Sequence, residues 1–211
     1  MRSNKGEVRI EEPTRLQRAI ARRAAESRAT IPHLELSADV ELADESDLLP
    51  RLVRACALAL RAVPRANASY RDGRFEIYSR VNVGVTMVSE DAYAIPTVFD
   101  ADAKSLQELR AEVSELQARA QSGQLSPPQL SGATFTVSQA AIDRAWPLLV
   151  PPQAAGLSAG APRAAPVVRA GAVVPGTVLT VALACDHRIL YGAVAAELLA
   201  AISFRLEETS Q

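Results

Sequence analysis

The sequence predicts an α/β fold with one mixed β-sheet flanked by helices. Helical and strand-like periodicities alternate along the 211 residues, and neither an internal repeat nor a clear linker divides them. Hydrophobic residues make up 48% of the chain and charged residues 22%, the balance of a protein that buries a core. A nearly continuous apolar segment near the C-terminus is typical of a strand covered on both faces. We therefore expect a single layered domain.

Four helices are predicted from apolar residues spaced three and four positions apart. They comprise residues 14–29, 48–63, 105–121 and 193–206. The first places Leu16 and Ile20 on one face and arginines on the other. The third starts with the capping box of Ser105 and Glu108, and Gly123 follows its end. Both ends of the third helix are therefore specified by the local sequence.

Strands are predicted where apolar residues alternate or run together. They comprise residues 33–42, 81–88, 93–99, 134–138, 154–159 and 177–185. The Asp72-Gly73 pair between Tyr70 and Phe75 indicates a hairpin. Residues 139–175 are rich in Ala, Pro and Gly, so we expect irregular structure there apart from the short strand that they include.

The charge of the chain gives no reason to expect nucleic acid or a membrane surface as a partner. Lys and Arg number 23 against 24 Asp and Glu, which leaves a net charge of -1. No apolar run is long enough to cross a bilayer, and the charged N-terminal segment lacks the apolar core of a secretory signal. Cys56 and Cys185 suit core positions in a reducing compartment, and neither histidine lies among metal-ligand residues. We expect a cytoplasmic protein without a bound metal.

One short segment is a candidate for chemistry: Asp186-His187-Arg188, followed by Tyr191-Gly192, at the end of the last predicted strand. Loops at strand ends hold side chains in place and commonly build sites. A histidine in such a loop can accept a proton near neutral pH. Taken alone, the segment also suits a hydrogen-bonded structural histidine, and the residues by themselves leave both interpretations open.

Further segments place His187 in a longer pattern. In chain order they are residues 14–16, 31–33, 67–69, 81–85, 95–96, 100–106, 132–138, 151–155 and 186–192. With these segments, residues 8–208 resemble the catalytic domain of the acyltransferase component of 2-oxoacid dehydrogenase complexes, which shares its fold with chloramphenicol acetyltransferase. The resemblance implies the coenzyme A-dependent acyltransferase fold.

The resemblance also implies roles for two residues. In that family the histidine matching His187 is the general base toward the attacking thiol or hydroxyl, and the serine matching Ser138 donates a hydrogen bond to the oxyanion. A thioester carbonyl is already electrophilic, so these two groups suffice without a covalent acyl-enzyme. The alternative for Ser138 is a strand-end hydroxyl bonded to backbone.

The same resemblance implies a homotrimer with each active site between two subunits. No permanently bound cofactor is expected. Acetyl-coenzyme A or an acyl-carrier thioester would be the co-substrate, so an acyl carrier protein is a candidate partner.

Several positions near the expected site depart from the family. Tyr191 stands where the family has Asp or Asn, and Arg15 aligns with the arginine that this residue normally contacts, so we expect that contact to change. Gln139 opens a different turn after Ser138. His33 aligns with a family histidine near the substrate passage, although a structural hydrogen bond at the strand start is the preferred interpretation.

Three functions are compatible with these features. The preferred one is a stand-alone acyltransferase that acetylates the hydroxyl of a small molecule, of the tetronate type found in antibiotic biosynthesis. The second is the catalytic core of a dihydrolipoyl acyltransferase. Because Met1 precedes the family core so closely, we expect no lipoyl or subunit-binding domain, which disfavours this core. The third is a non-catalytic subunit, for which Tyr191 argues and against which His187 and Ser138 argue.

Overall fold

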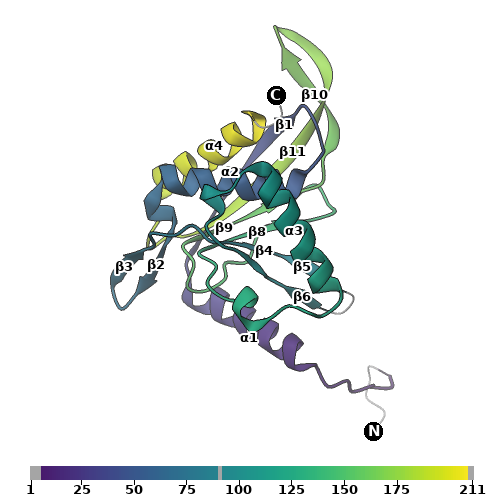
Figure 1. Ribbon diagram of the computed structural model, residues 1–211, viewed down its shortest axis with the longest axis vertical. Coiled ribbons are helices and arrows are strands. Elements are labelled where there is room, and N and C mark those ends of the chain that lie inside the picture. Colours follow the sequence, from purple (N-terminus) through teal and green to yellow (C-terminus); the bar gives the residue numbers. More distant parts are fainter. Residues whose placement is uncertain (1–5, 90–91, 209–211) are drawn as a thin grey trace.

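The computed structural model describes residues 6–89 and 92–208 and alternates helices and strands largely as predicted (Figure 1). The α-helices in this part of the chain are α1 (Arg15–Thr30), α2 (Leu48–Ala62), α3 (Leu106–Gln121) and α4 (Gly192–Glu208). Short 3-10 helices are η1 (Pro64–Ala66), η2 (Ala101–Ala103) and η3 (Pro127–Leu130). The strands are β1 (His33–Leu42), β2 (Ala68–Arg71), β3 (Arg74–Ile77), β4 (Val83–Val85), β5 (Met87–Ser89), β6 (Ala92–Ala94), β7 (Thr97–Val98), β8 (Phe135–Gln139), β9 (Ala155–Ala159), β10 (Arg163–Arg169) and β11 (Ala172–Asp186). None of these helices is long and apolar enough to cross a membrane.

The main sheet is mixed, as predicted. Its strands lie in the order β1-β11-β9-β8-β4-β7, and β10 pairs with the outer part of β11. β8 runs parallel to both β9 and β4, whereas β11 is antiparallel to β1, β9 and β10. Residues 178–186 of β11 are buried, which confirms the prediction of a covered strand for this segment.

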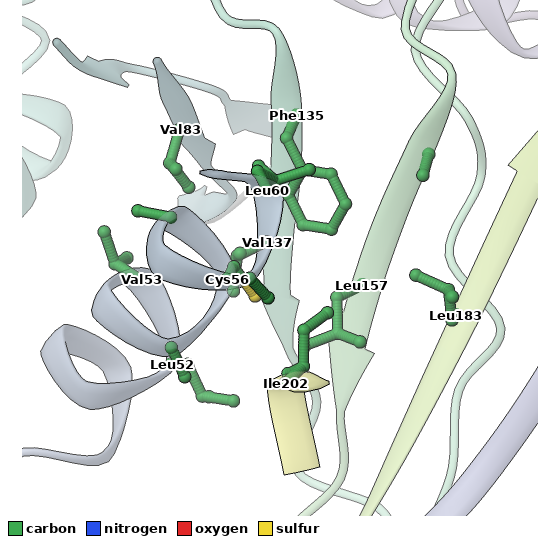
Figure 2. Packing of buried hydrophobic residues seen from close by; sticks show 14 of the residues in the cluster. Leu52, Val53, Cys56, Leu60, Val83, Phe135, Val137, Leu157, Leu183 and Ile202 are labelled. Carbon is green, nitrogen blue, oxygen red and sulfur yellow. The ribbon is translucent and has the colours of Figure 1, made fainter. Parts of the chain in front are cut away.

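The hydrophobic core lies between the sheet and the helix layer, in which α2 is packed between α3 and α4 (Figure 1). Figure 2 shows Cys56 and Leu60 of α2 pointing toward Phe135, Val137 and Leu157 of the sheet, and all five are buried. Burying a leucine of this kind stabilises the fold by about 1.5–3 kcal/mol. Burial also raises the pKa of the Cys56 thiol, as expected for a core residue rather than a nucleophile.

Helix α1 is formed as predicted but is not covered within this chain. A capping box starts it, since the side chains of Thr14 and Gln17 each accept a hydrogen bond from the other residue's backbone N–H. Leu16, on the predicted apolar face, is nevertheless 47% exposed, and Ser27 is the buried residue of this helix. Figure 1 shows α1 at the edge of the molecule, away from α4.

The strands predicted over residues 81–88 and 93–99 are each divided in two. β4 and β7 pair in the main sheet, whereas β5 and β6 form a separate two-stranded sheet. Pro96 lies at the break between β6 and β7. Proline has no backbone N–H, so a continuous strand through this position would lack one inter-strand hydrogen bond. Apolar spacing does not reveal a change of pairing partner, so the prediction of two continuous strands is wrong.

The prediction of irregular structure before Thr177 is also wrong. β10 and the first residues of β11 form a hairpin that extends from the body of the molecule (Figure 1). Pro166 faces Pro175 in its register. Two prolines can face each other only at a pair that exchanges no N–H bonds, so both fit this hairpin, although their presence argued against a strand.

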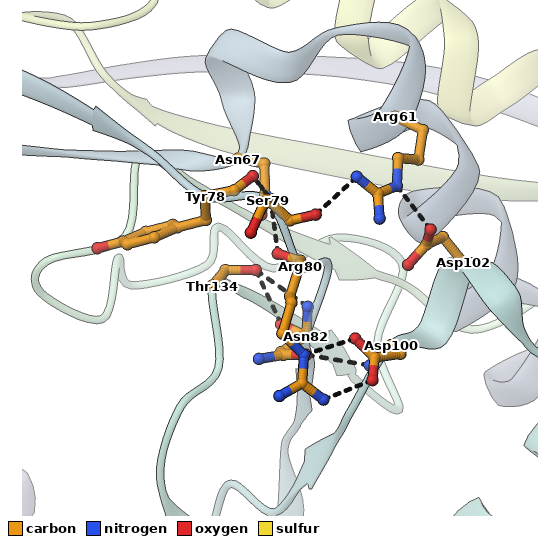
Figure 3. A network of polar contacts seen from close by, with 9 residues as sticks. All are labelled: Arg61, Asn67, Tyr78, Ser79, Arg80, Asn82, Asp100, Asp102 and Thr134. Carbon is orange, nitrogen blue, oxygen red and sulfur yellow. Dashed lines mark hydrogen bonds and ion pairs between the residues drawn. The ribbon is translucent and has the colours of Figure 1, made fainter.

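A polar network fixes η1 against the strands that follow it (Figure 3). The Asn67 side-chain amide donates to the carbonyls of Tyr78 (3.0 Å) and Arg80 (2.8 Å). Further along, the backbone N–H of Asn82 donates to the Thr134 hydroxyl (3.1 Å), which joins the segments entering β4 and β8. These bonds hold η1, which carries Arg65, in a defined position relative to the sheet.

Candidate active site

His187 directly follows the last residue of β11. Asp186, the end of that strand, is 1% exposed, whereas His187 is exposed. The backbone on either side is fixed: the Asp186 N–H donates to the Ala154 carbonyl (2.8 Å) and the His187 N–H to the Pro32 carbonyl (2.9 Å). The imidazole is therefore presented to solvent from a rigid strand end, as a base that must reach a substrate requires.

Asp186 and Arg188 form a bidentate ion pair on either side of His187. Arg188 Nε donates to Asp186 Oδ1 (2.9 Å) and Nη2 to Oδ2 (2.7 Å), while the Arg188 backbone N–H also donates to Oδ1 (3.0 Å). These hydrogen bonds, followed by the charge of Asp186, raise the pKa of Arg188. The guanidinium lies 4.6 Å from the centre of the Tyr70 ring. The two residues thus hold the turn around His187 and leave its imidazole free of the ion pair.

Tyr191 stands beside His187, at the place expected from the sequence. The two ring centres are 6.0 Å apart with an interplanar angle of 79°, an edge-to-face arrangement. Tyr191 is 53% exposed, and the Arg65 guanidinium lies 5.8 Å from its ring centre. An aromatic ring therefore borders the imidazole where the family has a smaller polar side chain.

Ser138 lies near the end of β8, away from the end of the sheet at which His187 lies. Its half-buried hydroxyl donates to the Leu157 carbonyl of β9 (3.3 Å). In this rotamer the hydroxyl donates to the backbone, as in the structural alternative given for Ser138 from the sequence. To donate to an oxyanion instead, the side chain would have to rotate. The next residue, Gln139, is exposed and lines a cavity of about 440 Å³ together with Ala140 and Ala141.

The pairing registers separate Ser138 from His187 within one chain. Ser138 pairs with Ser158, and Ser158 pairs with Ala182, five residues before His187. At about 3.3 Å per residue, the offset along the strands is about 16 Å. The two side chains of one chain cannot act on the same carbonyl group.

His33 lies beside the His187 turn, whereas Arg15 lies far from it. His33 pairs with Asp186 in the β1–β11 register, and the carbonyl of the preceding Pro32 accepts the His187 N–H. A carbonyl only accepts, so His33 Nδ1 carries the proton and donates to the Ile31 carbonyl (2.8 Å), while Nε2 faces the Ser27 hydroxyl at 3.5 Å. This agrees with the structural interpretation of His33. Arg15 is exposed in the first turn of α1. This helix is about 24 Å long, and His33 follows its other end.

Arg65 and Phe75 are residues of this site that sequence reasoning did not identify. The Arg65 guanidinium lies 4.5 Å from the centre of the Phe75 ring, and its Nε donates to the Ile189 carbonyl (3.0 Å). The Asp72-Gly73 turn, with φ of 50° and 76°, was recognisable as a hairpin and carries Phe75 on its second strand. Nothing in the local pattern linked that hairpin to His187.

The architecture is that of the coenzyme A-dependent acyltransferases. Chloramphenicol acetyltransferase matches it with a TM-score of 0.55 at 13% identity, over 88% of this chain and 94% of that one, which is a likeness of fold alone. The chain belongs to the family described as 2-oxoacid dehydrogenases acyltransferase (catalytic domain), whose model matches residues 43–211.

Similar proteins are named as dihydrolipoyl acetyltransferases. The pyruvate dehydrogenase complex component of Rhizobium meliloti is 35% identical over 91% of this chain and 48% of its own length. A mitochondrial component of Arabidopsis thaliana is 32% identical over 92% and 40%. The chain thus spans about half the length of these relatives. Dihydrolipoamide acetyltransferase of Azotobacter vinelandii has a similar structure, with a TM-score of 0.90 at 26% identity over 98% of this chain and 94% of that one.

Proposed function

We propose that this chain is the catalytic domain of a dihydrolipoyl acyltransferase, with His187 as its general base. The names of its relatives favour this function over the hydroxyl-acetylating one preferred from the sequence. The observation that carries the proposal is the exposed His187 at a rigid strand end. The Azotobacter vinelandii structure was determined to examine the catalytic roles of a serine, a histidine and an asparagine four residues after the histidine. We assign the corresponding roles in this chain to Ser138 and His187, on the strength of the sequence resemblance.

The chemistry follows from these groups. His187 removes the proton from the attacking dihydrolipoyl thiol, and the sulfur forms a bond to the carbonyl carbon of acetyl-coenzyme A. The carbonyl oxygen becomes an oxyanion, to which the Ser138 hydroxyl donates a hydrogen bond. Collapse of this intermediate breaks the bond to the coenzyme A sulfur, which takes up the proton from His187. The reverse sequence transfers the acyl group to coenzyme A.

Two subunits would supply the two groups. Within one chain Ser138 and His187 are offset by about 16 Å along the sheet, so a shared carbonyl must lie between copies. A closed homotrimer lets His187 of each subunit meet Ser138 of the next one. A cubic core is described for a pyruvate dehydrogenase complex whose chain matches this fold with a TM-score of 0.88 at 26% identity. Assembly of this chain into a larger core is part of the proposal.

A substrate comparison tests the proposal. The purified protein is given acetyl-coenzyme A with dihydrolipoamide and kcat/KM is measured by release of free coenzyme A. We expect efficient transfer that disappears in His187→Ala. Absence of transfer to dihydrolipoamide by a folded oligomer would contradict the proposed acceptor.

A second candidate acceptor is kept because of Tyr191. Its ring makes the surroundings of His187 bulkier than an asparagine would, which suits a compact alcohol. A hydroxymethyl tetronate is therefore offered in parallel, with acetyl-coenzyme A or an acetylated carrier protein as donor. Transfer to this alcohol alone would favour the small-molecule enzyme, and inactivity with every pair would favour a non-catalytic subunit.

A further inference from the structure

Arg65 links the β2–β3 hairpin to the turn that carries His187. It lies in η1, and its guanidinium lies over two aromatic rings, 4.5 Å from the centre of Phe75 and 5.8 Å from that of Tyr191. Its Nε also donates to the Ile189 carbonyl at 3.0 Å. One side chain thus contacts the residues two and four positions after His187.

Arg65 and Arg188 differ in the groups that their guanidinium charges contact. Arg188 pairs with Asp186. Within residues 6–89 and 92–208, no carboxylate lies within ion-pair distance of Arg65, and its side chain contacts the two ring faces and a carbonyl. Cation–π contacts from a planar guanidinium depend on geometry, so this arrangement restricts where the Tyr191 ring can lie.

The Tyr191 ring contacts the His187 imidazole, so a restricted Tyr191 ring also restricts where the imidazole can lie. The Tyr191 ring meets that of His187 edge to face at 6.0 Å, so Phe75, Arg65, Tyr191 and His187 form a continuous row of contacts. The backbone of the turn is also held by buried Ile189 and by the hydrogen bond from the His187 N–H to the Pro32 carbonyl. The imidazole is exposed, and its aromatic contact is with the Tyr191 ring.

We propose that Arg65 is a positioning residue for His187, acting through Tyr191 and the Ile189 carbonyl. The proposal rests on the proposed function for its kinetic consequence, but the contacts themselves do not. Tyr191 stands four residues after the base, where the Azotobacter vinelandii enzyme has its asparagine. Ring packing held by Arg65 orients the base from that position.

Histidine NMR tests the row of contacts directly, because the chain contains only two histidines. His33 provides an internal reference. Arg65→Ala should shift the ring-proton resonances of His187, since the aromatic face beside it is released, and leave those of His33 unchanged. Tyr191→Leu should shift the same His187 resonances, whereas Tyr191→Phe, which keeps the ring, should not. Arg74→Ala, at an exposed arginine of the same hairpin, is the matched control and should move neither histidine.

Kinetics then tests the consequence for the base. In Arg65→Ala we expect kcat to fall by about 10- to 100-fold with KM changed less than about twofold, because a misplaced base affects the transition state. Arg65→Lys, which keeps a cation but not the planar fork, should recover part of kcat. An unmoved His187 resonance in folded Arg65→Ala, or a rise in KM alone, would overturn the positioning role. If the enzyme has no activity toward dihydrolipoamide, the NMR comparison still decides whether the contacts exist.

Discussion

Ser138 and His187 lie toward opposite ends of the same sheet, because the Ser138–Ser158 and Ser158–Ala182 pairs place Ser138 level with a residue five positions before His187. Within one chain, the exposed imidazole and the half-buried hydroxyl are therefore too far apart to act on one carbonyl group.

Replacing His187 by alanine should lower acyl transfer by about 10²- to 10⁴-fold, because the variant lacks the proposed general base for the thiol. The side chain is exposed, so the fold should be unaffected. Steady-state rates and thermal unfolding of the same preparation check both statements. Near-normal turnover by the folded variant would remove His187 from the mechanism.

Replacing Ser138 by alanine should lower kcat by about 10²- to 10³-fold with a smaller change in KM, because an oxyanion bond strengthens chiefly in the transition state. The lost bond to the Leu157 carbonyl is one hydrogen bond at 3.3 Å, so stability should fall by about 1 kcal/mol or less. An effect on stability without any effect on kcat would mean that Ser138 is only a structural hydroxyl.

Mixing the two inactive variants should restore activity if the sites lie between subunits. In a trimer that contains both variants, one interface joins an intact His187 to an intact Ser138. Random mixing of subunits after unfolding and refolding should therefore recover about a quarter of the wild-type activity. Light scattering of the same sample gives the subunit number. A mixture that stays inactive although the subunits exchange, or a monomer at micromolar concentration, would contradict the shared site.

Removing the partner of Asp186 should destabilise the fold. Arg188→Ala leaves a carboxylate that is 2% exposed without its guanidinium. We expect a loss of roughly 2–4 kcal/mol, below that of a fully buried pair because Arg188 is 33% exposed. Urea unfolding measures it. Arg80→Ala, which breaks the exposed pair with Asp100, is the control and should cost much less than Arg188→Ala, because solvent screens an exposed pair.

The cysteine thiols should be inert in the native protein. Burial, and secondarily the charge of Asp186, raises the pKa of Cys185 to about 12, and burial raises that of Cys56. Because both folded values exceed the unfolded ones, this contribution to stability is complete at neutral pH and declines as the pH rises above the pKa of an unfolded thiol. A disulfide reagent at pH 8 should label neither cysteine until denaturant is added. Fast labelling of Cys185 without denaturant would disagree with its place in the core.

Much of the fold was predictable because it depends on local signals. The capping box of Ser105 and Glu108 defines the start of α3, and the alternation in β1 matches its ten residues. Predictions failed where strand pairing, rather than local amino-acid composition, determines the structure. The hairpin that contains Pro166 and Pro175 is stabilised by its register, and the separate β5–β6 sheet arises from a change of partner that spacing does not reveal.

For the candidate site, too, some features were predictable from local signals and others were not. Local residue patterns were enough to predict that His187 follows a buried strand, that Tyr191 accompanies it and that the chain resembles an acyltransferase. The three-dimensional arrangement was needed to show that Ser138 is too distant to share a site with His187 of the same chain, and that Arg65 contacts the Tyr191 ring. These relationships join residues 49 and 126 positions apart, and they depend on strand register and on how η1 packs against the turn. Local periodicity reports which face of an element is buried, but it contains no information about which distant element packs there.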